Sequence, residues 1–139
     1  MIHLVENALT VDEQLYLRQK VGWKPISRRQ SKLSLENCLF NVKAVDDMGN
    51  VVGMGRIVGD GAVISYIQDL IVIPEVQKQG VGSMIIERLI QYVESIREKD
   101  TTMMLCLMCA KGREKFYINH GFIPRPTDGL GPGMIQYME

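Results

Sequence analysis

Apolar residues recur at helical spacing in one long stretch of the chain, and a capping motif predicts another helix before it. A Thr10–Glu13 capping box predicts a helix that starts at residue 11 and ends at Gly22, after a short first strand at 2–6. The apolar stripe predicts a longer helix that reaches about Arg97. Its apolar positions are Val81, Ile85, Leu89, Val93 and Ile96.

Extended patterns occupy the middle of the chain. Residues 23–31 are expected to form a loop, and residues 32–39 a short second helix. Three strands are predicted within 40–73, because turn residues at 47–50 and the Gly-Asp-Gly at 59–61 interrupt the apolar pattern. Two such tight turns predict an antiparallel meander.

The last third of the chain continues with alternating elements. The apolar run at 101–110 predicts a strand, which should be parallel to the strand before the long helix, with a right-handed crossover. A final helix is expected at 112–121, where Gly121 stops it. Closing strands are expected at 122–126 and 134–138, separated by a Gly/Pro-rich loop that is a candidate lid.

The predicted order is therefore β-α-α-β-β-β-α-β-α-β. It indicates an α/β (mixed α+β) fold with a β-α-β unit at its centre. A length of 139 residues with 46% apolar and 23% charged residues is typical of a single globular domain. Lys+Arg and Asp+Glu balance at 16 each, so nucleic acid is not an expected partner. Without a signal-peptide pattern or an apolar run long enough to span a bilayer, we expect a soluble, cytoplasmic protein that does not bind membranes.

Cysteines raise the question of a metal site, because Cys106 and Cys109 form a C-x-x-C. They lie in a continuous apolar run, where an odd spacing sends two strand side chains to opposite faces. Only Cys38 remains, so neither a second metal-binding pair nor a disulfide framework is available. We therefore expect buried, reduced thiols and no metal.

A glycine-spaced turn in "VIPEVQKQGVGS", residues 72–83, joins the third central strand to the long helix. Gly80 and Gly82 allow a ligand to approach the backbone closely, and the N–H groups at a helix N-terminus suit a phosphate. Lys78 adds a full positive charge. The alternative is that the glycines only ease a tight turn.

Two common nucleotide-binding motifs do not fit this turn. No Gly-Lys-[Ser/Thr] follows it, so it is not a Walker loop. It also lacks the third glycine of the dinucleotide fingerprint and the acidic residue that would bind the ribose.

Together with a second motif, the turn resembles the GNAT superfamily of N-acetyltransferases. "DLIVIPEVQKQGVGSMIIERL" resembles the family's strand, proline, Q/R-x-x-G-x-G/A and helix pattern, with Gln77, Gly80 and Gly82 at the fixed positions. "KFYINHGF", Lys115 to Phe122, is similar to the family's F-Y-x-x-x-G-F signature. The predicted element order also resembles the family fold along essentially the whole chain.

The resemblance implies acetyl-CoA as the acyl donor. It places the pantetheine arm beside the backbone of Leu70, Ile71 and Val72. Tyr117 would protonate or hydrogen-bond the departing thiolate. The pyrophosphate would be bound by backbone N–H groups from Gln77, Lys78, Gln79, Gly80, Val81, Gly82 and Ser83.

The implied reaction is direct attack of a primary amine of a small molecule on the thioester, through a tetrahedral intermediate. Deprotonating the ammonium, stabilising the oxyanion and protonating the sulfur are the three tasks. The backbone N–H of Leu70 or Val72 is a candidate for the oxyanion. A protein or peptide amine, or a non-catalytic acyl-CoA-binding module, are the alternatives. Dimers are common among such enzymes, so a homodimer stays open.

The general base is the least defined residue. Asp69 is the acidic candidate on the strand before the turn, where hexosamine acetyltransferases carry two acids and this chain has Gln68 first. Asp69 could accept the proton, directly or with a water relay. Alternatively, it caps a loop or pairs with Arg56.

Acceptor-binding candidates come from two places. Arg28 and Arg29 fall with Trp23 in the expected loop that walls the acceptor pocket in the family, where they could bind an anionic or polar acceptor. Tyr66 lies on the same strand as Asp69 and could contact the substrate. For each arginine the alternative is plain surface exposure, and for Tyr66 it is a place in the core.

Overall fold

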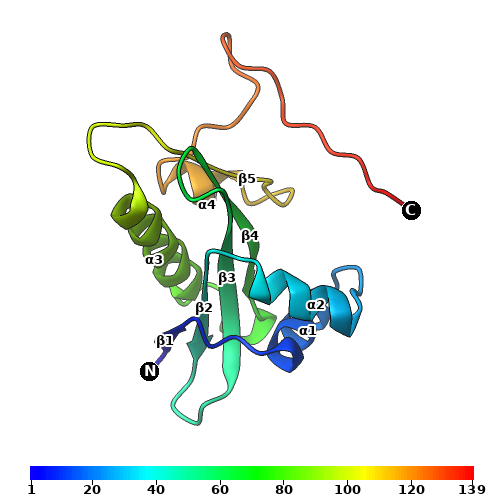
Figure 1. Cartoon of the computed structure of the whole chain (residues 1–139). Coiled ribbons are helices and arrows are strands. Elements are labelled where there is room, and N and C mark those ends of the chain that lie inside the picture. The colour runs from blue at the N-terminus through cyan, green and yellow to red at the C-terminus, as the bar shows by residue number, and fades with distance from the viewer. The chain divides into compact units, whose positions relative to one another are not determined.

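The computed structural model describes residues 1–139, which divide into the units Met1–Cys106 and Leu107–Glu139 (Figure 1). The strands and helices of the first unit are β1 (His3–Glu6), α1 (Val11–Lys20), α2 (Arg28–Glu36), β2 (Phe40–Val45), β3 (Val51–Gly59), β4 (Ile64–Val72), the short 3-10 helix η1 (Pro74–Val76) and α3 (Val81–Ile96). β5 (Met104–Leu107) begins in the first unit and ends at the first residue of the second, which contains α4 (Glu114–Ile118).

The strands form one mixed sheet in the order β1-β2-β3-β4-β5. β1 to β4 are successively antiparallel, which confirms the predicted meander. Its last turn is closed by Asp60, whose Oδ1 accepts the N–H groups of Ala62, Val63 and Ile64 at 2.8, 2.8 and 3.0 Å. β5 adjoins the start of β4, where the Met104 N–H donates to the Val63 carbonyl at 3.0 Å.

α3 covers one face of the sheet, and two glycines of β3 let it come close (Figure 1). A Cβ added at Gly55 would lie 2.8 Å from side-chain atoms of both Ile85 and Leu89. On the same face, the rings of Phe40 and Tyr92 stack with centroids 4.4 Å apart. The predicted apolar stripe is therefore the face of α3 that packs on the sheet.

α1 and α2 cover the opposite face (Figure 1). The predicted capping box of α1 is present, because Thr10 accepts from the Glu13 N–H and Glu13 accepts from the Thr10 N–H. Glu13 also reaches the sheet, where Lys43 Nζ lies 3.0 and 2.9 Å from its two carboxylate oxygens. The sheet is thus covered by helices on both faces, and eight apolar side chains of the core are fully buried. These are Leu17, Val42, Ala44, Met54, Ile57, Ile85, Ile86 and Leu89.

α2 begins earlier than predicted. The segment 23–31 was expected to be a loop, but α2 starts at Arg28, so Arg28 and Arg29 belong to its first turn. The physical reason is a second capping box, in which Ser27 accepts from the Gln30 N–H and Gln30 accepts from the Ser27 N–H.

Expected strands near the C-terminus are shorter or missing. The strand expected at 101–110 is only Met104–Leu107, and Cys109, expected to be buried, is exposed. Residues 122–139 form no strand. Around Pro126 the backbone instead forms a local turn, in which the Thr127 N–H donates to the Leu130 carbonyl at 2.8 Å. An alternating segment becomes a strand only when it pairs with a sheet edge, which its own pattern does not ensure.

Candidate functional site

The turn between β4 and α3 is held to the strand by Gln77. Its side-chain Nε2 donates to the Val72 carbonyl at 2.9 Å, and its backbone N–H donates to the Pro74 carbonyl at 3.3 Å. Both groups are therefore used inside the protein. Gln77 shapes the turn, and its N–H is not directed to a ligand.

Beyond Gln77, the turn leaves backbone donors without acceptors. Gly80 is the N-cap of α3 with a φ of 83°, and no side chain caps the helix. The Met84 N–H makes the first helical hydrogen bond, to the Gly80 carbonyl at 3.1 Å. The N–H groups of Val81, Gly82 and Ser83 precede that bond and have no helical acceptor. They point out of the positive end of a 16-residue helix, which is a suitable site for a phosphate.

A β-bulge lies on β4 just before this turn. Arg56 pairs with Gln68 and Met54 with Ile71, so Gly55 alone faces both Asp69 and Leu70. Asp69 has a φ of 61°, in the left-handed region that aspartate tolerates better than most residues. The extra residue turns the Asp69 side chain to the face that carries Gln68 and Arg56.

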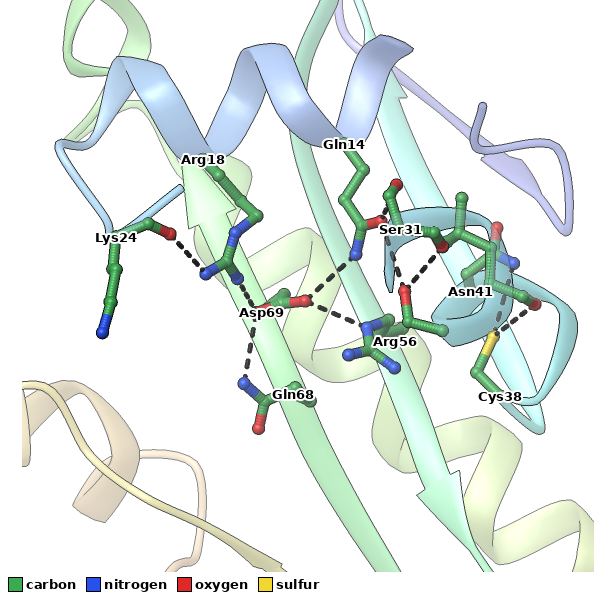
Figure 2. Close-up of polar contacts among 11 residues, drawn as sticks. Gln14, Arg18, Lys24, Ser31, Cys38, Asn41, Arg56, Gln68 and Asp69 are labelled. Atoms are coloured by element: carbon green, nitrogen blue, oxygen red, sulfur yellow. Dashed lines mark hydrogen bonds and ion pairs between the residues drawn. The ribbon is translucent and has the colours of Figure 1, made fainter. Parts of the chain in front are cut away.

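Four side chains donate hydrogen bonds to the Asp69 carboxylate, which is 1% exposed (Figure 2). Oδ1 accepts from Arg18 Nη1 at 2.9 Å and from Gln68 Nε2 at 3.2 Å. Oδ2 accepts from Arg56 Nε at 3.0 Å and from Gln14 Nε2 at 3.2 Å. A carboxylate offers about four acceptor positions, so all are occupied.

This cluster ties the helices to the sheet. Gln14 in turn accepts from the Ser31 hydroxyl, so α1, α2, β3 and β4 meet at Asp69 (Figure 2). The pairing of Asp69 with Arg56 that the sequence left open is present, and Arg18 is a second partner. The role of Asp69 as a base stays a prediction, but its saturated carboxylate favours holding side chains in place.

The expected acceptor-binding arginines lie on the surface. Arg28 Nη1 pairs with Asp12 Oδ1 at 2.7 Å, and its side chain is 68% exposed. Arg29 is also exposed, and no hydrogen bond or ion pair joins either arginine to Asp69. Tyr66 is half-buried on β4, opposite Val58.

Sequence reasoning did not select Arg18 as a site residue. It lies four residues after Gln14, so both side chains lie on the face of α1 that meets the sheet. The signal in the sequence was this polar i, i+4 pair on the face of a helix that is otherwise expected to be buried. A search for apolar periodicity does not detect such a pair.

Tyr117 lies on α4 in the second unit. Its ring meets Phe116 and Phe122 edge-on, with centroids 5.1 and 5.9 Å away. Burial, and after it the charge of Cys109, raises the pKa of Tyr117 to about 12, with Arg113 acting in the opposite direction. The phenol is therefore a protonated hydrogen-bond donor at neutral pH.

A family model supplies the identification. The model of the acetyltransferase (GNAT) domain matches residues 37–124, which include the bulge, the turn, α3 and Tyr117. The chain belongs to the GNAT acetyltransferase family. This confirms the resemblance found in the sequence.

Solved structures similar to this GNAT chain include two with notable sequence identity. One is a Staphylococcus aureus protein of unknown function described as a probable acetyltransferase, 30% identical with a TM-score of 0.85 over 99% of this chain and 100% of that chain. Another is a GNAT-family acetyltransferase from Streptococcus pneumoniae, 28% identical with a TM-score of 0.79 over 99% and 98% of the two chains. They confirm the predicted fold class.

A curated relative is the chloroplastic GCN5-related N-acetyltransferase 3 of Arabidopsis thaliana, 26% identical over 120 residues. The match covers 85% of this GNAT chain and 49% of the relative, so this chain spans about half the length of that protein. Because the two proteins differ so much in length, the acceptor of this chain is inferred from the geometry of its own site.

Two further features bear on the chemistry of this GNAT chain. No group of three His, Cys, Asp or Glu side chains is placed to hold a metal ion. None of the helices has the length and apolar content needed to cross a membrane.

Proposed function

We propose that this GNAT-family chain transfers the acetyl group of acetyl-CoA to a primary amine of a small molecule. The observation that carries the proposal is the uncapped N-terminus of α3, where Val81, Gly82 and Ser83 present N–H groups without helical acceptors. Membership of the acetyltransferase family supports acetyl-CoA as the donor.

The pyrophosphate of the donor would bind at this helix N-terminus. The left-handed conformations of Lys78 and Gly80, with φ of 65° and 83°, turn the backbone so that successive N–H groups face one region. Lys78 and Gln79 add donors there. Gln77 acts indirectly, because its bond to the Val72 carbonyl keeps the turn against the strand.

The reacting end of the donor would lie beside β4. In this proposal the backbone of Leu70, Ile71 and Val72 binds the pantetheine arm, and an N–H near the bulge donates to the oxyanion. A bulge disrupts the regular ladder and so makes backbone groups available beside a site. The interruption of the β3–β4 hydrogen-bond ladder at Asp69–Leu70 thus supports a role for this part of β4 in binding the reacting end of acetyl-CoA.

Proton transfer is assigned to water in this proposal. When the amine attacks, the new C–N bond forms, the C–S bond breaks, and the ammonium must lose a proton. Asp69 has no unoccupied acceptor position, because Arg18, Arg56, Gln68 and Gln14 take all four. A water molecule that passes the proton to solvent is therefore a better candidate, and Asp69 orients its neighbours.

Tyr117 would stabilise the leaving thiolate by donating a hydrogen bond. Its pKa, raised to about 12, lies above the ordinary thiol value of about 8.5. Complete proton transfer from the phenol to sulfur is therefore unfavourable. Coenzyme A would leave as the thiolate, stabilised by this hydrogen bond, and would take its proton from solvent.

The test measures donor binding first and turnover second. Calorimetry with acetyl-CoA compares the wild type with Gly82→Trp, which places a bulky ring at the proposed pyrophosphate site. Gln91→Trp, on the exposed side of the same helix, is the matched control. We expect binding to be lost only in Gly82→Trp, with both variants folded by circular dichroism.

Mass spectrometry of small amines and of lysine peptides then reports the acceptor class. Wild-type protein that binds no acetyl-CoA would refute the proposal, and acetylation of peptides alone would favour the peptide alternative.

A further inference from the structure

The Asp69 cluster carries one more positive than negative charge. Arg18 and Arg56 share the single carboxylate of Asp69, and the three side chains are 15%, 11% and 1% exposed. The neighbouring Glu13–Lys43 pair on the same face is balanced and adds no net charge. A net positive charge on side chains that are so little exposed to solvent is unfavourable unless a counter-charge is supplied.

The two arginines differ in how their donors are used. Arg18 donates through Nη1 to Asp69 and through Nη2 to the Lys24 carbonyl at 3.0 Å, and its guanidinium lies 5.3 Å from the centroid of the Trp23 ring. Arg56 donates only through Nε, to Asp69. Its Nη1 and Nη2 make no hydrogen bond or ion pair within the protein, and neither is a buried atom without a partner, so both reach solvent.

Figure 2 shows the terminal nitrogens of Arg56 directed away from Asp69, with Gln68 bonded to the same carboxylate. Nε is fixed by the ion pair, so the guanidinium plane is held and its outer edge is a preorganised pair of donors. Beside it, the Gln68 amide donates through Nε2, while its Oε1 accepts no hydrogen bond. The pair offers a cationic fork and a neutral acceptor on one face of the sheet, next to the bulge.

We propose that Arg56 binds an anionic group, a carboxylate or a phosphate, on the acceptor amine. The assignment rests on the proposed function and adds the substrate class. Two parallel N–H donors match two oxygens of either group, and the bound anion supplies the missing counter-charge. Gln68 Oε1 accepts a hydrogen bond from an N–H or O–H of the same molecule. The acceptor is therefore a small amino acid-like or phosphorylated amine.

The turnover test uses amines that differ only in the anionic group. One pair is β-alanine and β-alaninamide, and the other is O-phosphoethanolamine and ethanolamine. Release of the coenzyme A thiol gives kcat and KM for each. We expect a kcat/KM for the anionic member of one pair that is about 10- to 100-fold higher, mainly through KM, because a charge-assisted hydrogen bond is worth this factor. The pair that responds distinguishes carboxylate from phosphate.

Variants separate anion binding from support of the cluster. Arg56→Lys keeps the charge but loses the fork, and should reduce the anionic-to-neutral ratio by about 10-fold or more. Arg18→Lys is the matched control, since it disturbs the other arginine on Asp69 but leaves the outer edge of Arg56 in place. It should leave the ratio unchanged. Equal loss of the ratio in both variants would overturn the assignment.

A direct binding experiment tests the anion site without requiring turnover. Wild-type protein saturated with coenzyme A, which would occupy the turn between β4 and α3, is titrated with β-alanine and with O-phosphoethanolamine. NMR follows the arginine Nε–Hε signals, with Arg56 assigned through Arg56→Lys. A shift at Arg56 without acetylation of any amine would retain the anion site and refute the proposed function. Acetylation of neutral and anionic amines at equal efficiency, with no shift at Arg56, would refute the anion site and retain the function.

Discussion

Replacing Asp69 by asparagine tests whether the buried cluster supports the fold as its geometry indicates. Asparagine has nearly the same shape and also tolerates the positive φ of 61° found at this position. The substitution therefore removes the negative charge and little else. Arg18 and Arg56, with side chains 15% and 11% exposed, then lose the carboxylate that they share.

The expected loss of stability follows from that exposure. Removing one partner of a buried ion pair costs about 3–5 kcal/mol, and the small remaining exposure of both arginines places this case near the lower end. Urea unfolding should show it as a fall in midpoint on the order of 1–2 M, for a typical slope. The native state of a domain this size has about 5–15 kcal/mol of stability, so the variant should still fold.

Asp12→Asn is the matched control, because Asp12 pairs with Arg28 at 2.7 Å but the two side chains are 82% and 68% exposed. Exposed pairs contribute about 1 kcal/mol or less. Equal costs for the two substitutions would refute the reasoning about burial.

The same Asp69→Asn protein also tests the base. If Asp69 only positions its neighbours, the folded variant should retain most of the wild-type kcat; a fall of about 100-fold or more would identify Asp69 as the base.

Three further predictions use other parts of the structure. Tyr117→Phe should lower kcat by about 100-fold, because the leaving thiolate loses a hydrogen-bond donor. In an alkaline absorbance titration the variant should also lack the tyrosine that ionises near pH 12. Because the pKa of Tyr117 is raised, wild-type kcat should show no loss from this group near neutral pH. Gly55→Ala should cost about 1–3 kcal/mol in urea unfolding, because its Cβ would lie 2.8 Å from side-chain atoms of both Ile85 and Leu89. A cost that neither an Ile85→Ala nor a Leu89→Ala background reduces would contradict these contacts. Asp60 accepts from the N–H groups of the β3–β4 turn, first among them that of Ile64, and these lower its pKa below the ordinary 3.8. Its contribution is therefore present above pH 3.8 and lost as the pH falls below it, so the stability difference between wild type and Asp60→Asn should narrow in acid; a constant difference would show that the carboxylate charge is not involved.

Local patterns were sufficient for the elements that are stabilised by their own neighbours. The capping box at Thr10, the stripe on α3 and the turn at Asp60 each act within a few residues, so their effect is visible in the sequence. The turn between β4 and α3 was also predictable from neighbouring residues, since its glycines lie directly at the uncapped start of the helix. The start of α2 was equally local, and the Ser27–Gln30 capping box that marks it was missed.

Segments that depend on a partner were not predictable in this way. The residues 134–138 alternate like a strand, but no strand forms there, because pairing depends on an edge supplied by the rest of the chain. The same holds for Cys109, whose apolar neighbours suggested burial although it is exposed. Periodicity describes how a segment could pack but not whether a partner is present.

By itself, the sequence determined the order of the elements through β5 and α4, the glycine-spaced turn between β4 and α3, and the resemblance to the GNAT family. Only the tertiary structure decided the surroundings of Asp69. Its partners Arg18 and Gln14 are 51 and 55 residues away in the chain, and they meet it because α1 packs across the sheet. A one-residue bulge turns the carboxylate to that face. Ion pairs between distant segments depend on how helices and strands pack, and this information is spread over the whole chain.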